Sequence, residues 1–486
     1  MTEYKKPKKF DRNMIVIGAG SAGLVTSYIA ATVKARVTLI EGHRMGGDCL
    51  NTGCVPSKAL LRSAAVIHEM GRAADFGLKP VTVDFDFADV MDRVQQKIET
   101  IAPHDSIERY TQLGVECITG YAKLISPWEV EVNGQILSAR SIVIATGARP
   151  ALPPIPGLAN TGFVTSDTVW DLRAKPKSIA IMGGGPIGCE LSQAFSRLGV
   201  EVMQIEMLPR LLMREDEEVS ALVLQQFREQ GIRVMLEHKV VGVDRYARDK
   251  VLICEHHGKR VVVNCDEILV AVGRTANVDG LGLEDLGIEL NPNRTIKTDD
   301  YLRTPKYPHI LACGDVAGPY QFTHTASHQA WYASVNGLFG SLKKFKADYS
   351  VIPWATFTDP EVARVGLNEL EAQERNIPYE VTRYSLSGLD RAITDDETQG
   401  FVKVLTKPGK DKILGVTIVA AHAGELIAEY VLAMKHGLGL NKLLGTIHIY
   451  PTMNEANKNT AGEWRKNHKP EWLLRWVERY HHWRRH

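Results

Sequence analysis

The chain has 486 residues, of which 44% are hydrophobic and 24% charged, and its formal net charge at pH 7 is +1. This length predicts roughly two to four domains, and the near-neutral charge gives no overall indication of nucleic-acid binding. The basic start MTEYKKPKKFDRN lacks the apolar segment of a secretory signal, and no stretch of about 18 uncharged apolar residues predicts a membrane span. We therefore expect a globular protein of the cytoplasm.

The first predicted element is a dinucleotide fingerprint. NMIVIGAGSAGLVTSYIA, residues 13–30, predicts a short apolar strand, a glycine turn and a helix. Gly18 allows the tight turn, Gly20 lets a pyrophosphate approach the backbone, and Gly23 lets the helix pack closely on the strand. The anion is expected at the helix N-terminus. Glu41, which ends the next predicted strand RVTLIE, is placed to accept hydrogen bonds from a ribose.

A closely spaced pair of cysteines follows in GGDCLNTGCVPSK, residues 46–58. No second Cys or His pair with ligand spacing lies near Cys49 and Cys54, which argues against a metal site. Seven cysteines spread thinly over the chain do not form the pattern of a secreted disulfide framework either. On these residues alone, a redox pair and two buried thiols are both open interpretations. The remaining cysteines are expected to be small core residues: Cys117, Cys189, Cys254, Cys265 and Cys313.

This segment must be irregular if the two sulfurs are to react with each other. A regular helix would separate these Cα atoms by about 7.5 Å along its axis, and a disulfide needs them nearer than about 7 Å. Gly53 and Pro56 supply the irregularity. The N-terminus of a following helix and the charge of Lys58 would both lower the pKa of a thiol.

The fingerprint recurs in SIAIMGGGPIGCELSQAF, residues 178–195, and the next predicted strand EVMQIE again ends in an acid, Glu206. Two copies with the same spacing to a terminal acid predict two nucleotide sites. A carboxylate at Glu206 repels a 2′-phosphate and favours NADH over NADPH, although Arg210 follows closely and offers a compensating charge. The repeated glycines are Gly183, Gly185 and Gly188.

Three apolar strands end in a small residue and a glycine: IVIATGARP (142–150), ILVAVGRTAN (268–277) and HILACGDVAG (309–318). We interpret the first two as crossover points. The third delivers Gly314 and Asp315 to a turn, where the carboxylate either binds a sugar-like or ribityl hydroxyl or simply forms the turn. The Pro-rich PPIPGL, residues 153–158, marks a first domain boundary, and a second falls near Tyr349–Pro353.

Seven motifs occur in the order GAGSAG, GGDCLNTGCVPSK, ATG, GGGPIG, AVGR, CGD and PTMNE. Through them the chain resembles, over roughly residues 11–462, the class I flavin-dependent pyridine nucleotide-disulfide oxidoreductases, the family of dihydrolipoamide dehydrogenase, glutathione reductase and mercuric reductase. The resemblance implies an α/β fold with two Rossmann-like dinucleotide-binding domains, for FAD and NAD, and a C-terminal α+β dimerisation domain of a homodimer. The implied division is 1–152 (FAD-binding, first part, with the redox cysteines), 153–272 (NAD(P)-binding), 273–350 (FAD-binding, second part), 351–462 (dimerisation) and 463–486 (basic aromatic tail).

The resemblance also implies roles for the cysteine segment. Cys49 would exchange with the substrate, and Cys54 would lie against the flavin ring as a charge-transfer donor. Lys58 would lie near the flavin N5 and pair with Glu190, on the helix after the second fingerprint. Hydride would arrive from the nicotinamide on one face of the flavin, and electrons would leave through the disulfide on the other. FAD contacts are expected at Gly18, Gly20, Gly23, Glu41, Gly47, Lys58, Thr146, Gly147, Gly314, Asp315 and Ala326, and NAD contacts at Gly183, Gly185, Ile187, Gly188, Glu206 and Gly273.

The sequence departs from the family at its C-terminal motif. Disulfide-reducing members carry H-P-T-x-x-E, whose His is the acid-base partner of the outer thiol across the dimer, whereas this chain has Tyr450 and Glu455 in YPTMNE. A phenol with a pKa of about 10 is a poor proton carrier near neutrality. His448 lies two residues earlier, on the same side if the segment is a strand, but a structural His is the favoured interpretation.

Three functions are therefore open. The first is an NAD(P)H oxidoreductase that passes electrons through a Cys49–Cys54 disulfide to a disulfide or thiol acceptor, as dihydrolipoamide dehydrogenase does. The second is a mercuric or other soft-metal-ion reductase, since PWATFTDPEVARVG and LDRAITDDETQGF resemble that branch, although the sequence carries neither its C-terminal Cys pair nor its N-terminal CxxC domain. The third is a redox-sensing flavoprotein with low turnover.

The chain ends in EWRKNHKPEWLLRWVERYHHWRRH, which contains four of the eight tryptophans. Residues 464–486 carry seven Lys or Arg and two acids, a local charge of +5. A basic, aromatic helix of this kind could contact an anionic membrane or a partner, but packing on the body of the dimer is the favoured interpretation. The predicted helix face consists of Trp472, Trp476 and Tyr480, with Leu473 and Trp483 beside it.

Overall fold

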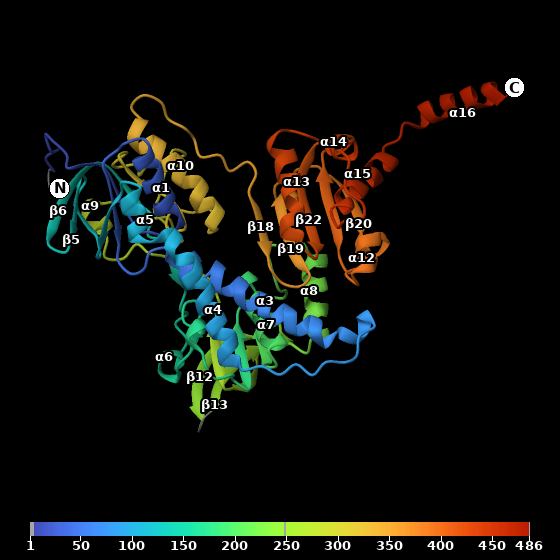
Figure 1. Ribbon diagram of the computed structural model, residues 1–486, viewed down its shortest axis with the longest axis horizontal. Helices are drawn as coiled ribbons and strands as arrows, with labels where there is room; N and C mark the ends of the chain where they lie inside the picture. Colours follow the sequence, from blue (N-terminus) through green and yellow to red (C-terminus); the bar gives the residue numbers. More distant parts are fainter. Residues whose placement is uncertain (1–3, 247–248, 486) are drawn as a thin grey trace. The chain divides into compact units, whose positions relative to one another are not determined.

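The computed structural model describes residues 4–246 and 249–485. These form two compact units, whose elements are labelled in Figure 1. The units are Met1–Pro209 with Phe227–Asp348 (unit 1), and Arg210–Gln226 with Tyr349–His486 (unit 2). The change of unit after Asp348 agrees with the boundary expected near Tyr349. The finer division into five parts stays a prediction.

Unit 1 contains a first sheet of the dinucleotide-binding type. Strands β3, β2, β1 and β6 are parallel neighbours in that order, β17 is also parallel to β6, and β5 and β4 extend β6 as antiparallel strands. Met14, Ile15 and Val16 of β1 are fully buried, as expected for a parallel strand that is covered on both faces. The strands are β1 (Arg12–Ile17), β2 (Val37–Glu41), β3 (Glu116–Thr119), β4 (Lys123–Ser126), β5 (Glu129–Val132), β6 (Gln135–Ile144) and β17 (Ile310–Ala312).

Helices α1 and α10, from distant parts of the sequence, pack against each other and on this sheet. The long helix α3 packs instead against α4 and α7. Asp86 starts α4 by accepting a hydrogen bond from the main-chain N–H of Ala88. The helices are α1 (Ser21–Thr32), α2 (Gly47–Asn51), α3 (Cys54–Gly71), α4 (Phe87–Ile101), α5 (Ile107–Gln112), α9 (Leu283–Leu286) and α10 (Thr323–Phe339), with the short 3-10 helices η1 (Ala73–Phe76) and η2 (Ala102–Asp105).

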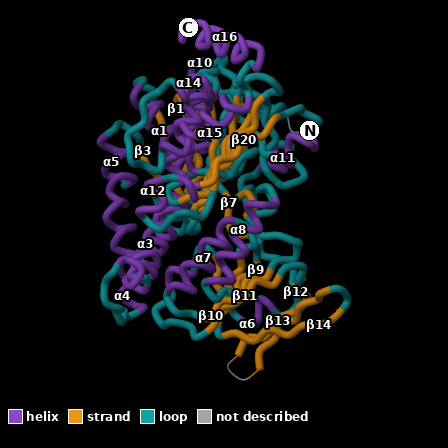
Figure 2. The backbone as a smooth tube through the Cα atoms, turned by 90° about the vertical axis from the view of Figure 1, so that its right-hand side faces the viewer, coloured by secondary structure: helices purple, strands orange, loops and turns teal. Residues whose placement is uncertain are grey.

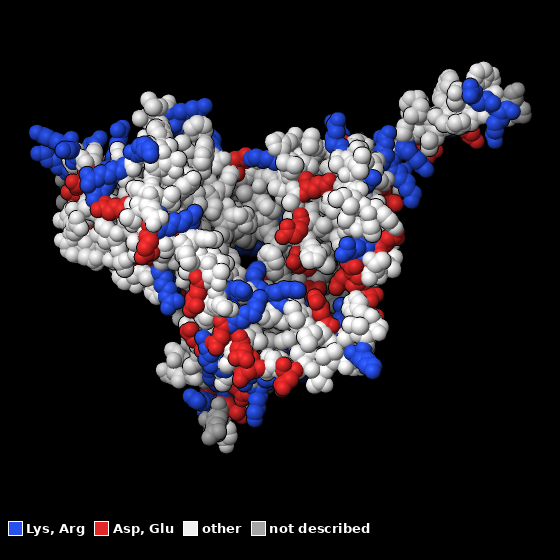
Figure 3. Space-filling model, in the orientation of Figure 1, with Lys and Arg blue, Asp and Glu red and all other residues white. Residues whose placement is uncertain are grey.

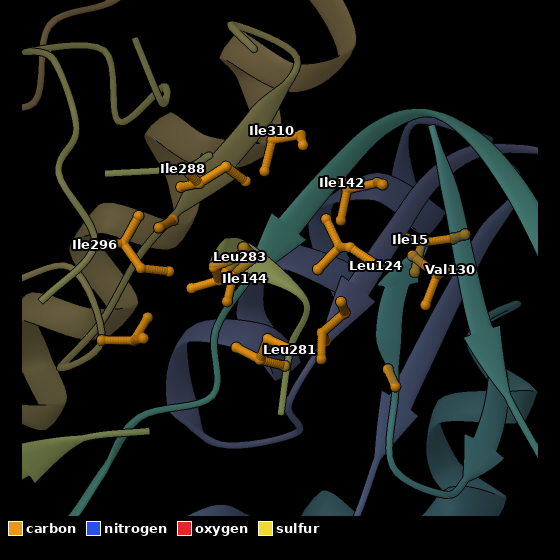
Figure 4. Packing of buried hydrophobic residues seen from close by; sticks show 14 of the residues in the cluster. Ile15, Leu124, Val130, Ile142, Ile144, Leu281, Leu283, Ile288, Ile296 and Ile310 are labelled. Carbon is orange, nitrogen blue, oxygen red and sulfur yellow. The ribbon is translucent and has the colours of Figure 1, made fainter. Parts of the chain in front are cut away.

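Two separated stretches of sequence build the core beside the first sheet. Figure 4 shows Ile15 of β1 and Ile142 of β6 together with Leu281, Leu283 and Ile296, which follow the second sheet in the sequence. All five belong to one buried cluster. Burial of apolar surface contributes about 25 cal/mol per Å², so this packing joins the two stretches into one domain.

A second parallel sheet in unit 1 repeats the plan of the first. Its order is β11-β10-β9-β15-β8, and α7 follows β9 as α1 follows β1. An antiparallel meander of β12, β13 and β14 stands in the sequence between β11 and β15, and Figure 2 shows it in orange. Strands β7 and β16 pair antiparallel, at the two segments expected to be crossovers. The elements are β7 (Ala148–Pro150), α6 (Leu158–Thr161), β8 (Val164–Thr165), η3 (Val169–Asp171), β9 (Ser178–Met182), α7 (Pro186–Arg197), β10 (Glu201–Ile205), β11 (Arg233–Met235), β12 (Lys239–Tyr246), β13 (Asp249–His256), β14 (Lys259–Cys265), β15 (Glu267–Val270) and β16 (Arg274–Ala276).

The cysteines outside the close pair are packing residues. Cys189, Cys254, Cys265 and Cys313 are buried, and Cys117 is half-buried. Burial raises the pKa of each of these thiols. They are therefore protonated near neutral pH and are poor nucleophiles.

Unit 2 is built on an antiparallel sheet of order β18-β19-β22-β21-β20. Every residue of β21 is buried, and α13 packs on β19 and β22 while α15 packs on β20 and β21. This arrangement is the predicted α+β domain. The elements are α8 (Glu217–Glu229, which begins in this unit), β18 (Pro353–Thr356), β19 (Glu361–Gly366), α11 (Glu369–Glu374), β20 (Glu380–Ser385), η4 (Leu386–Gly388), α12 (Asp390–Thr394), β21 (Phe401–Thr406), β22 (Ile413–Ala420), α13 (Ala423–Lys435), α14 (Leu440–Leu444), α15 (Glu455–Asn467) and α16 (Glu471–Arg485).

A buried lysine ties the segment 210–226 to the rest of unit 2. The side chain of Lys403 on β21 is 1% exposed, and its ammonium lies 2.5 Å from Asp216 and 2.6 Å from Glu218. Glu369 is a third partner at 2.9 Å. Burial alone would lower the pKa of Lys403, but hydrogen bonds to the three carboxylates outweigh it and raise that pKa. The lysine is therefore charged, and its charge is matched inside the protein.

A second buried cation joins the same two segments. Arg364 on β19 is also 1% exposed, and it pairs with Glu215 at 3.2 Å and with Glu371 at 3.0 Å. The Trp354 ring stacks on its guanidinium at 4.2 Å, and the indole N–H donates to Glu215 at 2.9 Å. Burial raises the pKa of Glu215, which the neighbouring arginine opposes.

The C-terminal helix α16 is exposed at every residue in the described part of the protomer. Packing of this helix on the body of the dimer stays a prediction. Among residues 4–246 and 249–485, no helix is both long and apolar enough to cross a bilayer.

We predict that Lys403→Met destabilises the folded protein by about 3 kcal/mol or more, because it leaves buried carboxylates without their cation. The free energy of unfolding in urea measures the effect. Lys346→Met is the control, because that lysine pairs with Asp300 at an exposed position and its loss should not be measurable. Equal stability of the two variants would contradict the importance of the buried network.

Candidate active site

Glycine forms the tight turn at both nucleotide sites, and the two turns have nearly the same geometry. Gly18 and Gly183 have φ of 101° and 115°, and a Cβ on either would lie 2.4 Å from a main-chain oxygen. In the helix that follows, a Cβ on Gly23 would lie 1.7 Å from the main-chain oxygen of Gly18. A Cβ on Gly188 would lie 2.1 Å from the main-chain oxygen of Gly183. Only glycine fits these four positions.

The helix after each turn has its N-terminus open to a ligand. Helices α1 and α7 are capped by Gly20 and Gly185, which supply no side chain. A Cβ on Gly185 would meet nothing within 4 Å, and one on Gly20 would meet only the Cα of Gly47, at 3.8 Å. The N–H groups and the dipole of such a helix end bind a phosphate. Both turns therefore fit a dinucleotide pyrophosphate.

The acid at the end of the second strand is held in the same way at both sites. Glu41 accepts hydrogen bonds from the main-chain N–H groups of Ala19 and His43, at 2.6 Å and 2.7 Å. Glu206 accepts equivalent hydrogen bonds from the main-chain N–H groups of Gly184 and Leu208, at 2.5 Å and 2.7 Å. A carboxylate oxygen that accepts one hydrogen bond can accept another, so both acids remain able to bind ribose hydroxyls.

The cysteine segment is divided between two helices. Cys49 lies on α2, and Cys54 is the first residue of α3. Gly53, with φ −114° and ψ −103°, turns the chain between them, and its N–H donates to the main-chain oxygen of Asp48 at 2.7 Å. This turn is the irregularity expected from the sequence. It brings the two free thiols into hydrogen-bond contact.

The contact makes the two thiols unequal. The Cys49 thiol donates a hydrogen bond that lowers the pKa of Cys54 to about 6, against the effect of burial. The hydroxyl of Thr323, which begins α10, lies 3.3 Å from the Cys54 sulfur and also lowers this pKa, as does the charge of Lys58. The same thiol contact, with burial, raises the pKa of Cys49. At neutral pH the reduced pair holds one proton, on Cys49, and Cys54 is the thiolate.

The ion pair implied by the resemblance is present. The Lys58 ammonium lies 2.7 Å from Glu190, and the glutamate side chain is 8% exposed. Lys58 is in the first turns of α3, whereas Glu190 is on α7, so the pair joins the cysteine helix to the helix of the second nucleotide site. It keeps a positive charge on the helix that begins with the Cys54 thiolate.

A partly buried carboxyl lies at the turn after β17. Burial raises the pKa of Asp315 to about 6, although Arg274 opposes the shift. The Arg274 guanidinium lies 3.8 Å from Asp315 and 2.7 Å from Asp48, the residue that precedes Cys49. A buried carboxyl with so little direct pairing can take hydroxyl donors, which fits the ribityl chain of FAD. Arg274 was not singled out from the sequence, because its two partners lie on distant segments.

The other predicted cofactor contacts lie on the same elements. Gly314 has φ 81° and donates from its N–H to Gln329 of α10 at 2.6 Å. A Cβ there would lie 3.1 Å from Ala22 on α1 and 3.5 Å from Ala326 on α10, so three segments meet closely at this turn. Of the others, Gly47 opens α2, Thr146 and Gly147 follow β6, Ile187 lies in the first turn of α7, and Gly273 precedes β16.

Tyr450 is held by an acid that the sequence did not reveal. The tyrosine is 66% exposed, and its hydroxyl donates to Asp390 at 2.9 Å. This hydrogen bond and the charge of Asp390 raise the pKa of Tyr450, so even less of the phenol is ionised and able to accept a proton near neutral pH. Glu455 accepts from the main-chain N–H of Thr452 at 3.4 Å. Asp390 was missed because it lies 60 positions away in the sequence.

His448 is a structural residue, as the sequence favoured. Its Nε2 lies 2.9 Å from a carboxylate oxygen of Glu429, its Nδ1 lies 3.0 Å from the main-chain oxygen of Thr446, and its side chain is 2% exposed. The segment forms no strand, so the period of two does not apply, and Tyr450 is exposed where His448 is buried. His448 therefore cannot replace the missing base.

Comparison with known families identifies both parts of the chain. Residues 12–330 match the pyridine nucleotide-disulphide oxidoreductase family, and residues 352–461 match the dimerisation domain of that family. The chain belongs to this family of flavin-dependent oxidoreductases. It is an enzyme that acts on a sulfur group with FAD and NAD(P)H, and it forms a homodimer.

Relatives of two kinds are similar over most of the chain. Dihydrolipoyl dehydrogenase from Chlamydia pneumoniae is 35% identical over 91% of this chain and 94% of its own. Mercuric reductase from Lysinibacillus sphaericus is 35% identical over 92% of this chain and 82% of its own. Among solved structures, a Cu(II) complex of the HOCl-induced flavoprotein disulfide reductase RclA from Escherichia coli has a TM-score of 0.82 and 26% identity, covering 92% of this chain and 98% of that one.

We predict that the reduced protein is alkylated by iodoacetamide with a midpoint near pH 6, because Cys54 is a thiolate above its lowered pKa. Cys54→Ser should remove this reaction. Thr323→Val should move the midpoint to higher pH, since it removes a hydrogen bond to the thiolate. Thr32→Val, at an exposed position of α1, is the matched control and should not move it. A wild-type midpoint near 8.5, the ordinary value for cysteine, would refute the assignment.

Proposed function

We propose that the protein takes hydride from NADH and delivers the electron pair through Cys54 and Cys49 to a disulfide or thiol acceptor. The observation that carries this proposal is the Cys54 thiolate at the start of α3, stabilised by the thiol of Cys49. FAD, when bound, supplies the hydride acceptor between nicotinamide and sulfur. The similarity to dihydrolipoyl dehydrogenase and to a flavoprotein disulfide reductase supports an acceptor of this class.

The reduced pair can transfer two electrons by thiol–disulfide exchange. Cys49 loses its proton, and its sulfur bonds to one sulfur of the acceptor while the other leaves as a thiolate. The Cys54 thiolate then attacks the Cys49 sulfur, the mixed disulfide breaks, and the second acceptor sulfur leaves. The acceptor is reduced and the cysteine pair is oxidised. Lys58, paired with Glu190, favours the thiolate form of Cys54 throughout.

A reductase of soft metal ions is the second candidate, and the Tyr450–Asp390 hydrogen bond favours it. The proton of Cys49 needs a base before a disulfide can be attacked, and this phenol cannot serve as one. A soft cation that binds both sulfurs displaces the proton directly. The likeness to mercuric reductase and to a protein solved with Cu(II) supports this alternative.

The metal would be a substrate at the cysteine pair. Within the described part of the chain, no group of three or more His, Cys, Asp or Glu could hold a resident ion. The intact cysteine motif of residues 46–58 argues against the third function, a redox sensor with low turnover.

The same proposal covers location and organisation. We place the enzyme in the cytoplasm, because its buried cysteines are unpaired thiols. The five-part division predicted from the sequence follows the order of nucleotide fold, second nucleotide fold and dimerisation domain. Any peripheral contact with a membrane or partner would use the basic tail, which takes no part in the exchange chemistry.

Replacing Tyr450 by His should restore the missing base. We expect Tyr450→His to raise the turnover of lipoyl or glutathione-type disulfides by about tenfold or more, since general acid-base catalysis typically contributes 10²–10⁴-fold. NADH oxidation followed at 340 nm measures the rate. Tyr450→Phe is the matched control and should not raise it. If Tyr450→His leaves disulfide turnover unchanged while the wild type reduces soft metal ions, the metal-ion function holds instead.

We predict that NADH is preferred to NADPH and that Glu206→Gln narrows the preference about tenfold, because it removes the charge that repels a 2′-phosphate. Arg210 does not compensate, since its guanidinium donates to the main-chain oxygen of Glu215 at 3.2 Å. The ratio of kcat/KM for the two nucleotides measures the preference. Glu201→Gln, at the exposed start of β10, should leave the ratio unchanged, and a wild type that prefers NADPH would overturn the assignment.

A further inference from the structure

We propose that helix α16 attaches the protein to an anionic membrane surface, a function separate from the proposed redox chemistry. Every residue from Glu471 to Arg485 is exposed in the protomer. A helix of 15 residues is only marginally stable in water without a packing surface. Its aromatic and basic side chains nevertheless recur at regular helical spacing, and this pattern indicates the kind of surface that covers the helix.

The aromatic side chains of α16 form one stripe. Trp472, Trp476 and Tyr480 follow one another at a spacing of four, and Trp483 continues the stripe three residues later. Their exposed fractions are 62%, 66%, 53% and 71%. Tryptophan and tyrosine combine an apolar ring with one polar group, and they therefore concentrate at the boundary between water and lipid tails.

The charges of α16 are arranged around this stripe. Helical spacing places Arg475 and Arg479 along one edge of the aromatic residues and Glu471 and Glu478 on the opposite face. The last turn adds two further arginines, and Figure 3 shows white and blue atoms over most of the helix. Arginine side chains at such an edge reach the headgroups while the rings enter the apolar layer. The whole pattern is that of a helix lying in the plane of an anionic membrane.

Other occupants fit the helix less well. A coiled coil with the second subunit would need aliphatic side chains at successive seam positions, whereas three of the four residues at that spacing are aromatic: Leu473, Trp476, Tyr480 and Trp483. A transmembrane position is ruled out, because none of the helices in the described residues can cross a bilayer.

The test is sedimentation of the full-length homodimer with vesicles. We expect it to pellet with vesicles of equal phosphatidylcholine and phosphatidylglycerol and to stay in solution with pure phosphatidylcholine. Deletion of residues 469–486 should abolish pelleting. Arg475→Glu with Arg479→Glu should lower the partition coefficient by about tenfold or more, because each basic residue near the surface adds attraction.

Matched variants separate lipid binding from general effects. Trp472→Ala with Trp476→Ala should reduce pelleting, whereas Trp331→Ala, which removes a 43% exposed tryptophan of α10, should not. Glu478→Gln should increase it, because a repelled charge is lost. NADH oxidation in solution should be the same for the tail variants and the wild type, so failure of this proposal and failure of the redox proposal are distinguishable.

Three outcomes would overturn the proposal. The first is a wild type that does not pellet with anionic vesicles at low salt. The second is equal pelleting with both lipids, or pelleting that survives the deletion. The third is a wild type that binds no lipid together with a deletion variant of half the molar mass in solution. That result would assign the helix to the contact between subunits.

Discussion

The hydrogen bond between Cys49 and Cys54 depends on a break between two helices, and the proposed redox chemistry depends on that hydrogen bond. Gly53 turns the chain so that one sulfur ends up on α2 and the other at the start of α3. A continuous helix would remove the thiol–thiol hydrogen bond, the largest cause of both pKa shifts, and would leave the two sulfurs too far apart to form a disulfide. The break places a proton on one sulfur and a negative charge on the other, before any substrate arrives.

The two nucleotide sites are near copies at the level of the backbone. The first glycine of each, the capping glycine of each helix and the acid of each second strand have matching conformations and contacts. A pyrophosphate and a ribose are common to both cofactors, so this shared geometry cannot distinguish them. The difference comes from what surrounds the first site: the partly buried Asp315 with Arg274, and the cysteine pair on α2 and α3. The repeated turn binds the pyrophosphate and ribose that both cofactors share, and the side chains around the first site distinguish it from the second.

Much of this was predictable from the sequence, because the motifs are local. The glycines, the two acids and the paired cysteines each lie within one strand–turn–helix stretch, where spacing alone indicates geometry. Thr323, Arg274 and Asp390 could not be found that way. Thr323 meets Cys54 across 269 positions, and only the fold brings them together.

The dimerisation domain shows the same limit. His448 and Tyr450 would share a side only on a strand, and the segment is irregular. The sequence also could not show that residues 210–226, placed within the second nucleotide domain, belong by contact to unit 2. The exposure of α16 was equally hidden, because an amphipathic pattern does not say which surface will cover it.

That crossed membership of residues 210–226 means that neither unit exists as a continuous piece of the polypeptide. A fragment ending before residue 349 would keep Glu215 and Asp216 but lose Arg364 and Lys403, and a fragment starting there would keep two buried cations without those two acids. Each would hold unmatched charge in an apolar interior, at a cost of several kcal/mol. The two units therefore cannot be produced as separate stable fragments by cutting the chain at residue 349.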